Sequence, residues 1–141
     1  MLRTLMLVSV LALAAACSPQ PQQMTQAQLV ERGQYLVLNA GCNDCHTPGT
    51  AQGPDMSRSL QGSPLAFGPV QGVEIPGWVT VAPQVAGLPQ GWTEEQFASF
   101  MQTGVRPNGT RPGIPMPPYR WNEEDARAIA AYVHSLPKAE H

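Results

Sequence analysis

One short stretch governs the interpretation of this sequence: Cys42-Asn43-Asp44-Cys45-His46. Two thiols three positions apart on one helical turn can reach the two vinyl groups of a porphyrin and form thioethers. The imidazole that follows them then lies under the ring, where it can bind iron. C-x-x-C-H is the pattern of covalent c-type haem attachment. We therefore predict one covalently attached haem c per chain, held by Cys42 and Cys45, with His46 as an iron ligand.

Two other kinds of site also use closely spaced cysteines. A thioredoxin-like dithiol needs a β-α-β pattern around the cysteines, and no such pattern surrounds Cys42. A structural zinc site needs a second pair of ligands, and the remaining histidines, His134 and His141, both lie near the carboxyl end. Haem attachment is therefore the interpretation that we carry forward.

Composition limits the class of protein further. The chain has 141 residues, enough for one domain, and 43% of them are hydrophobic while 13% are charged, which argues against charged disorder. The 13 Gly and 15 Pro follow no fixed period and predict a loop-rich body between a few helices. A net charge of −2 with Lys138 as the one lysine argues against a nucleic-acid partner.

The amino end has the pattern of an export signal. Arg3 precedes a mainly apolar run over residues 5–16, which is too short to span a membrane. The run ends before Cys17 in a sequence that resembles the lipobox of bacterial lipoproteins, although Ala14 stands where Leu is usual. We expect residues 1–16 to be a signal peptide and Cys17 to be lipidated. Plain secretion and a structural cysteine in a retained helix are the alternatives.

These features predict how the chain is divided. Residues 17–28 are polar, with two prolines and five glutamines, and are expected to form a lipid-anchor and tether segment. Residues 29–137 are expected to form the folded domain, and residues 138–141 a tail. The predicted location is the periplasmic side, with the protein anchored to the membrane.

Two segments repeat apolar residues every three or four positions, as amphipathic helices do. The first runs from Leu29 to Ala40 and leads into the cysteines. The second covers residues 93–103, with Thr93 and Gln96 as a capping box at its start. Gly104 can end this second helix.

A third helical segment follows Asn122, which is a good N-cap, and Pro137 ends it. The acidic first turn, residues 123–125, complements the helix dipole. Its expected buried stripe consists of Ile129, Tyr132, Val133 and Leu136. Between Thr47 and Gly91 the periodicity disappears. A loop this long in a compact domain is either floppy or wraps something large and apolar.

A six-coordinate iron needs a second axial ligand, and we favour Met116. It lies in Gly113-Ile114-Pro115-Met116-Pro117-Pro118, where prolines on both sides predict a stiff extended strap. Met101 lies in the apolar stripe of the second helix and is expected to pack in the core. A loop methionine packed on the surface is the alternative for Met116. The full set of candidates is Met24, Met56, Met101, Met116, His134 and His141.

With these residues together, the chain resembles the class I monohaem c-type cytochromes over about residues 29–137. The resemblance implies a small all-α fold of three main helices plus long loops wrapped around one covalently bound haem. It also implies that the first and last helices cross, with Gly33 allowing close approach of Tyr132. The part after Thr93 is similar to bacterial cytochromes that serve periplasmic dehydrogenases.

The resemblance implies one residue that supports His46. The family has a Gly-Pro shortly after the proximal histidine, and the Pro carbonyl accepts a hydrogen bond from the imidazole. Gly53-Pro54 matches this pattern, so Pro54 is the expected acceptor. Residues 57–91 do not align with the family, which leaves the lining of that haem edge open.

Iron with both axial positions filled has no open place for dioxygen or peroxide. We therefore expect a one-electron carrier rather than an enzyme, working between exported redox partners such as a periplasmic dehydrogenase or a terminal oxidase. A haem enzyme or sensor in which Met116 is labile, and which binds peroxide or a small gas, is the alternative. A fixed subunit of a dehydrogenase or oxidase is a third interpretation. The arginines beside the strap form either a basic collar for an acidic partner or solvated loop charges: Arg106, Arg111 and Arg120.

Overall fold

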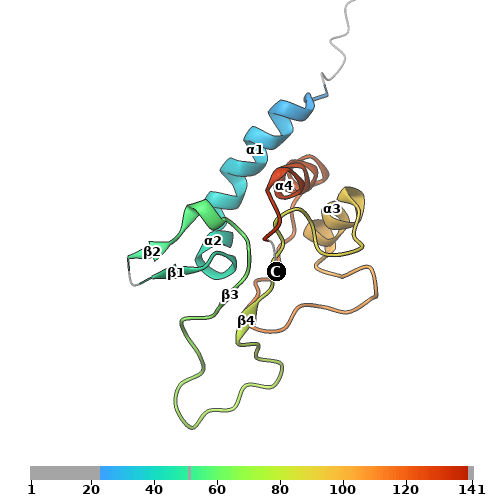
Figure 1. The fold of residues 1–141 in the computed structure, drawn as a ribbon. Helices are drawn as coiled ribbons and strands as arrows, with labels where there is room; N and C mark the ends of the chain where they lie inside the picture. Colours follow the sequence, from blue (N-terminus) through green and yellow to red (C-terminus); the bar gives the residue numbers. More distant parts are fainter. Residues whose placement is uncertain (1–22, 51, 140–141) are drawn as a thin grey trace, which may run out of the picture.

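The computed structural model describes residues 23–50 and 52–139. The predicted signal peptide, Cys17 and His141 lie outside these residues. Four α-helices are present in the described part (Figure 1): α1 (Gln26–Asn39), α2 (Cys42–His46), α3 (Glu94–Thr103) and α4 (Glu123–Ser135). None of the helices within the described residues is long and apolar enough to cross a membrane.

The loops contain short regular elements, so an all-α description is incomplete. Two antiparallel two-stranded sheets pair β1 with β2 and β3 with β4, and a 3-10 helix, η1, follows β2. The bounds are β1 (Gly49–Thr50), β2 (Gly53–Pro54), η1 (Met56–Arg58), β3 (Ser63–Pro64) and β4 (Val81–Ala82). The three main helices appear where the sequence predicts them, except that α1 begins three residues earlier, at Gln26.

Helix α1 begins earlier than its apolar pattern indicates. Thr25 is the N-cap, its side chain accepts from the Gln28 backbone at 3.3 Å, and the Gln28 side chain accepts from the Thr25 backbone at 2.9 Å. This capping box satisfies two backbone donors at the helix end. Residues 26–28 are therefore helical, although the sequence prediction includes them in the tether segment. They were missed because this first turn is polar.

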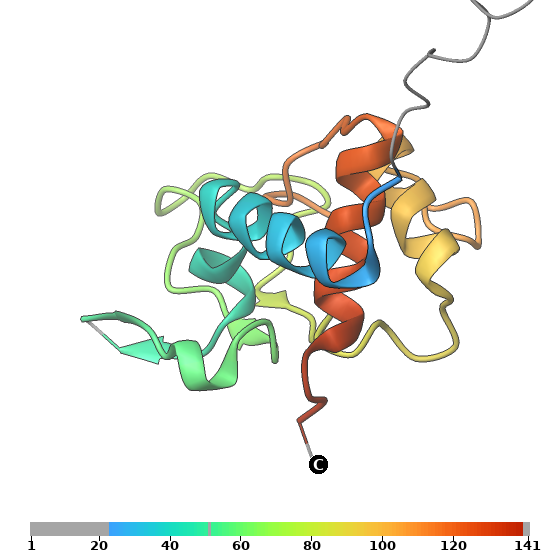
Figure 2. The same cartoon turned by 90° about the horizontal axis from the view of Figure 1, so that it is seen from above.

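Helices α1 and α4 cross at very short range (Figure 2). A Cβ atom at Gly33 would overlap the Ala128 carbonyl oxygen and come within 2.7 Å of the Tyr132 Cβ atom. The expected approach of Tyr132 to Gly33 is thus confirmed. An ion pair adds to this contact, because Arg32 Nε lies 2.7 Å and Arg32 Nη2 2.5 Å from Asp125 Oδ1.

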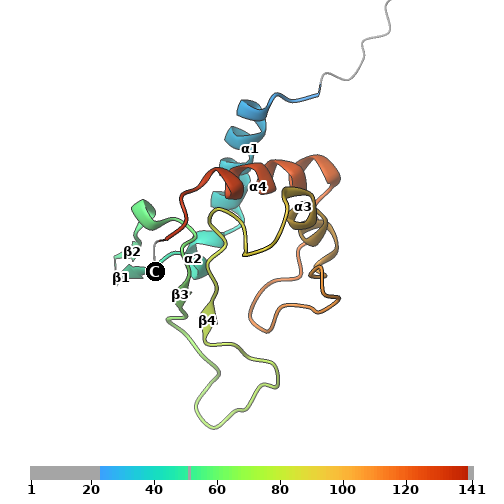
Figure 3. The ribbon, with the colours of Figure 1, turned by 45° about the vertical axis from the view of Figure 1, so that its right-hand side comes forward.

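Helix α3 packs beside α4 and completes the core (Figure 3). Its boundaries follow the sequence prediction: Thr93 and Gln96 form the capping box, and Gly104 ends the helix with φ of 68°. Only a residue that tolerates a left-handed backbone fits that last position easily. The buried side chains of the three helices include Leu36, Val37, Phe97, Met101, Ile129 and Val133.

The long segment between α2 and α3 is held by backbone hydrogen bonds. Below the β3–β4 pair the segment extends away from the helices (Figure 1). The part of it shortly before β4 is attached to the proline-rich strap. There the Ile114 amide donates to the Gly77 carbonyl at 2.9 Å, and the Val79 amide donates to the Ile114 carbonyl at 2.7 Å. The segment and the strap that carries Met116 are therefore joined.

Candidate functional site

A cavity of about 640 Å³ lies between the helices and two long loops, the one between α2 and α3 and the one between α3 and α4. Its volume is in the range of protein sites for small ligands and cofactors. Its wall includes the four side chains that the sequence assigns to attachment and ligation: Cys42, Cys45, His46 and Met116. Most of the remaining wall is apolar and comes from both helices and loops, including Val37, Leu60, Leu65, Phe97, Ile129 and Val133.

The two cysteines belong to the single short helix α2, which starts after Gly41 in the left-handed conformation. Burial raises the pKa of the Cys42 thiol from 9.0 to about 11. Burial, followed by the charge of Asp44, also raises the pKa of Cys45. Both side chains are therefore thiols at neutral pH. A reactive dithiol needs a lowered pKa, so this environment does not support a thioredoxin-like activity.

His46 is buried, with 9% of its surface exposed, and its ring orientation is determined by a hydrogen bond. Nδ1 lies 2.8 Å from the Pro83 carbonyl oxygen. A carbonyl oxygen only accepts, so Nδ1 carries the proton and Nε2 keeps a free lone pair. Burial lowers the pKa of His46, and the bond to Pro83 opposes that effect. The imidazole is therefore neutral at pH 7, as a metal ligand must be.

The acceptor of the His46 hydrogen bond is Pro83, and the prediction of Pro54 is wrong. Pro54 lies in β2, where it pairs with Gly49 and is exposed. Shortly after α2 the chain forms the β1–β2 pair, and Gly53-Pro54 is the second strand of that pair. The chain returns to His46 at Gly62, whose amide donates to the His46 carbonyl at 2.7 Å, and at Pro83 after β4. The sequence carried no local signal for Pro83, which is 37 residues from His46.

A buried polar network attaches α2 to the segment after η1. Asn43 Oδ1 accepts from Thr47 Oγ1 at 2.7 Å and from Ser59 Oγ at 2.8 Å. Thr47 Oγ1 in turn accepts from the Leu60 amide at 2.8 Å. Neither Asn43 nor Thr47 is among the residues that the sequence predicts for the site, although both flank motif residues. Their burial, 4% and 3% exposed, depends on the later segment, and a polar side chain alone does not reveal it.

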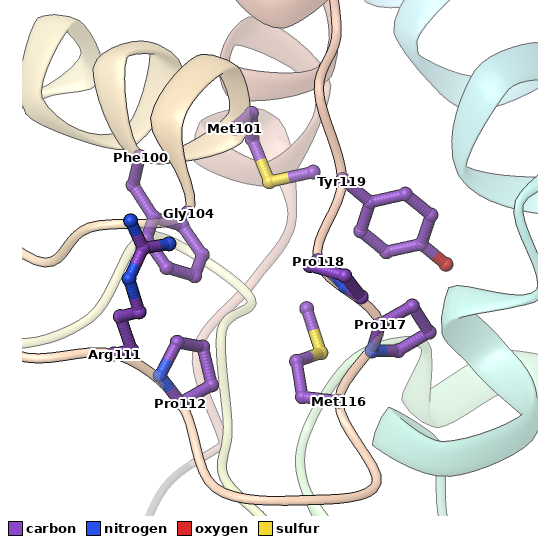
Figure 4. A pocket seen from close by; sticks show the side chains of 9 residues that line it. All are labelled: Phe100, Met101, Gly104, Arg111, Pro112, Met116, Pro117, Pro118 and Tyr119. Atoms are coloured by element: carbon purple, nitrogen blue, oxygen red, sulfur yellow. The ribbon is translucent and has the colours of Figure 1, made fainter.

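Two methionines, Met116 and Met101, line the cavity. A smaller cavity of about 90 Å³ lies between the end of α3 and the strap, and Figure 4 shows both methionine side chains beside it. Met101 is 4% exposed and belongs to the hydrophobic core. Met116 is on the strap and is only partly buried. The structure thus brings Met116 to the same cavity as His46, and Met101 also reaches that cavity.

The other candidate axial ligands within the described residues lie elsewhere. Met24 packs against the outside of the core, and Met56 is 46% exposed in η1. His134 Nδ1 lies 2.7 Å from Glu94 Oε2 at the surface between α3 and α4. None of these three side chains lines the cavity.

The arrangement fits a haem c. Two protonated thiols on one helical turn, a neutral imidazole with a free nitrogen, and a thioether line one largely apolar cavity. Thiols attach the porphyrin, and nitrogen and sulfur are ligands that haem iron accepts.

The Cytochrome c family model matches residues 30–137, and the chain therefore belongs to the cytochrome c family. Membership of this family implies a covalently bound haem c and electron transfer.

Curated relatives are longer proteins. A "Diheme cytochrome c-type" protein of Cereibacter sphaeroides is 33% identical over 117 residues, which cover 78% of this chain and 36% of the relative. The cytochrome c subunit of a quinone alcohol dehydrogenase from Gluconacetobacter polyoxogenes is 29% identical, over 85% of this chain and 28% of the relative. The fructose dehydrogenase cytochrome subunit of Gluconobacter japonicus is 27% identical, over 81% and 23%. The chain spans about a third or less of these relatives.

Proposed function

We propose that this chain is a one-electron carrier with a single haem c, ligated by His46 and Met116. The observation that supports the proposal most directly is that Cys42, Cys45, His46 and Met116 line one cavity. One C-x-x-C-H motif in the chain supports one haem. In the diheme relative, by contrast, this chain matches only 36% of the length.

When bound, haem c supplies an iron that alternates between the ferrous and ferric states and so carries one electron. His46 and Met116 would bind the iron, and the mainly apolar wall of the cavity would exclude water. His46 presents a neutral nitrogen because Pro83 holds its other ring nitrogen. Met116 offers a soft, neutral sulfur, which favours ferrous iron and raises the potential. The prolines around Met116 restrict the strap, so the ligand set changes little between the two states.

The proposed partners are redox proteins. Two relatives are cytochrome subunits of an alcohol dehydrogenase and of a fructose dehydrogenase. From these relatives we infer the class of partner, a dehydrogenase that donates electrons to this chain. A terminal oxidase that accepts electrons from it is the other proposed partner. Export to the periplasmic side and a lipid anchor at Cys17 complete the proposal, and they rest on the amino-terminal pattern. A chain of this kind serves either as a free shuttle or as a subunit.

The test is to produce the exported protein with haem attachment and to compare Met116→Leu with the matched control Met101→Leu. A pyridine haemochrome spectrum should report two thioether links. Met116→Leu should lose the charge-transfer band of sulfur-ligated ferric iron and its six-coordinate low-spin character, whereas Met101→Leu should keep both. Colourless protein would overturn the proposal. If instead Met101→Leu lost these features and Met116→Leu kept them, Met101 would be the axial ligand.

Binding of carbon monoxide or cyanide separates the carrier from the enzyme or sensor. A carrier with both axial positions filled resists these ligands. Rapid binding by the resting wild-type protein would indicate a labile Met116 and would replace electron transfer with ligand binding as the function.

A further inference from the structure

Tyr119 joins two segments that are far apart in the chain. Its hydroxyl donates a hydrogen bond to the Ala40 carbonyl oxygen at 2.7 Å, across 79 positions of sequence. Ala40 is the C-cap of α1 and directly precedes Gly41 and the attachment motif. Tyr119 is three residues after Met116. One hydroxyl thus connects the segment that carries Cys42 and His46 with the strap that carries Met116.

The surroundings of the ring keep this hydroxyl in place. Tyr119 is half-buried and stacks on Trp121, with ring centroids 5.9 Å apart and an interplanar angle of 28°. The Trp121 amide donates to the Met101 carbonyl at 3.2 Å, which attaches this end of the strap to α3. The hydroxyl also lies against the Cys42 thiol. The bond uses one of the carbonyls that every helix leaves unpaired at its carboxyl end.

The strap is therefore attached on both sides of Met116. Before it, Ile114 exchanges backbone hydrogen bonds with Gly77 and Val79. After it, Tyr119 bonds to Ala40. Between Met116 and Tyr119 stand Pro117 and Pro118, whose fixed φ angles leave little freedom. A displacement of Tyr119 is thus transmitted to the Met116 side chain.

We propose that Tyr119 is a positioning residue for Met116, and that its hydrogen bond to Ala40 holds the strap closed over the cavity. This inference rests on the proposed function, because it assigns Tyr119 a role toward the axial sulfur. The hydroxyl acts through the strap, because its hydrogen bond goes to the Ala40 carbonyl and not to His46 or Met116. Its loss should let the strap open more often and expose the position that Met116 occupies.

The experiment compares Tyr119→Phe with the matched control Tyr35→Phe in the haem-loaded protein. Tyr35 is on α1 and 62% exposed, and its hydroxyl takes part in none of the strap contacts described above. The measured quantity is the rate at which added imidazole replaces the methionine on ferric iron, followed by loss of the sulfur charge-transfer band. Because one hydrogen bond is lost, Tyr119→Phe should react roughly three- to tenfold faster. Tyr35→Phe should react at the wild-type rate.

Thermal unfolding of the same proteins separates positioning from general support. A lower unfolding midpoint with an unchanged exchange rate would mean that Tyr119 only stabilises the fold, and would overturn the inference. Wild-type protein without the sulfur band would overturn the proposed function itself.

A second variant covers the case in which Tyr119→Phe does not fold. Pro118→Ala keeps the hydroxyl, and Pro118 is exposed. The substitution makes the backbone between Met116 and Tyr119 more flexible, so imidazole should replace Met116 faster than in wild type. The increase should be smaller than in Tyr119→Phe. An unchanged rate would contradict the transmission through the strap.

Discussion

The helical half of the body, formed by α1, α3 and α4, buries its own apolar side chains, whereas the loop half, residues 52–91 and 105–121, exposes many of them. Val37 and Ile129 are 1% and 2% exposed, while Phe67 and Val70 are 51% and 77% exposed. The apolar side chains of the helices are buried against one another, although several of them also line the cavity. The loops are held by backbone hydrogen bonds and would gain further contacts from a group that fills the cavity. Met116 reaches this cavity from the loop half, and His46 reaches it from α2. Its occupant should therefore stabilise the loops more than the helices.

Removal of the haem should give the largest effect and the clearest test of this comparison. In the Cys42→Ala/Cys45→Ala variant, covalent attachment is impossible. We expect amide hydrogen exchange in residues 60–86 and 113–121 to accelerate by about tenfold or more relative to the α1–α4 contact, because local opening follows the loss of buried contacts. Exchange measured by mass spectrometry on both proteins checks this. Equal acceleration in both halves would break the comparison.

Gly33→Ala should destabilise the helical half strongly. The added methyl group would overlap the Ala128 carbonyl, which is backbone and cannot rotate away. Overpacking of this kind costs about 1–3 kcal/mol, and we expect the upper end. The matched control is Gly68→Ala in the loop half, where a Cβ meets nothing within 4 Å and the change should stay within about 0.5 kcal/mol. Denaturant unfolding of the two variants measures the difference, and similar losses would contradict our description of the α1–α4 crossing.

The smallest effect concerns a local contact of the loop half. Hydrogen bonds from Ser57, and then from Arg58, hold the pKa of Asp55 below its ordinary value of 3.8. A lowered pKa in the folded state means that this contact stabilises η1 above pH 3.8 and is lost as the pH falls from there through the folded pKa. In Ser57→Ala the pKa should rise toward 3.8, as measured by NMR titration of the carboxyl group. Ser63→Ala, the control, should leave the pKa unchanged.

Residues that act through near neighbours in the chain were predictable. Thr93, Gln96 and Gly104 bound α3 as expected, because caps and left-handed ends depend on a few consecutive residues. The first turn of α1 escaped prediction for a related reason. Its capping box of Thr25 and Gln28 is visible in the sequence, but it lies outside the apolar stripe that predicts the helix.

Residues that act across the fold were not predictable in the same way. The family resemblance implied that a proline carbonyl would support His46, and the structure has one, but it is Pro83 rather than Pro54. The choice depends on where the chain returns after the β1–β2 pair. Asn43, Thr47 and Tyr119 likewise become important only through partners 13 to 79 positions away.

The amino-acid sequence alone determined the attachment motif and the three main helices, because each depends on short-range spacing. The close approach at Gly33 was implied by the family resemblance, and it depends on the absence of a side chain at that position. Only the tertiary structure decided which carbonyl holds His46, that Met116 and His46 share one cavity, and that Tyr119 closes the strap against α1. These contacts join segments separated by long irregular loops. The path of such loops follows from packing and hydrogen bonding of the whole body, which local sequence patterns do not encode.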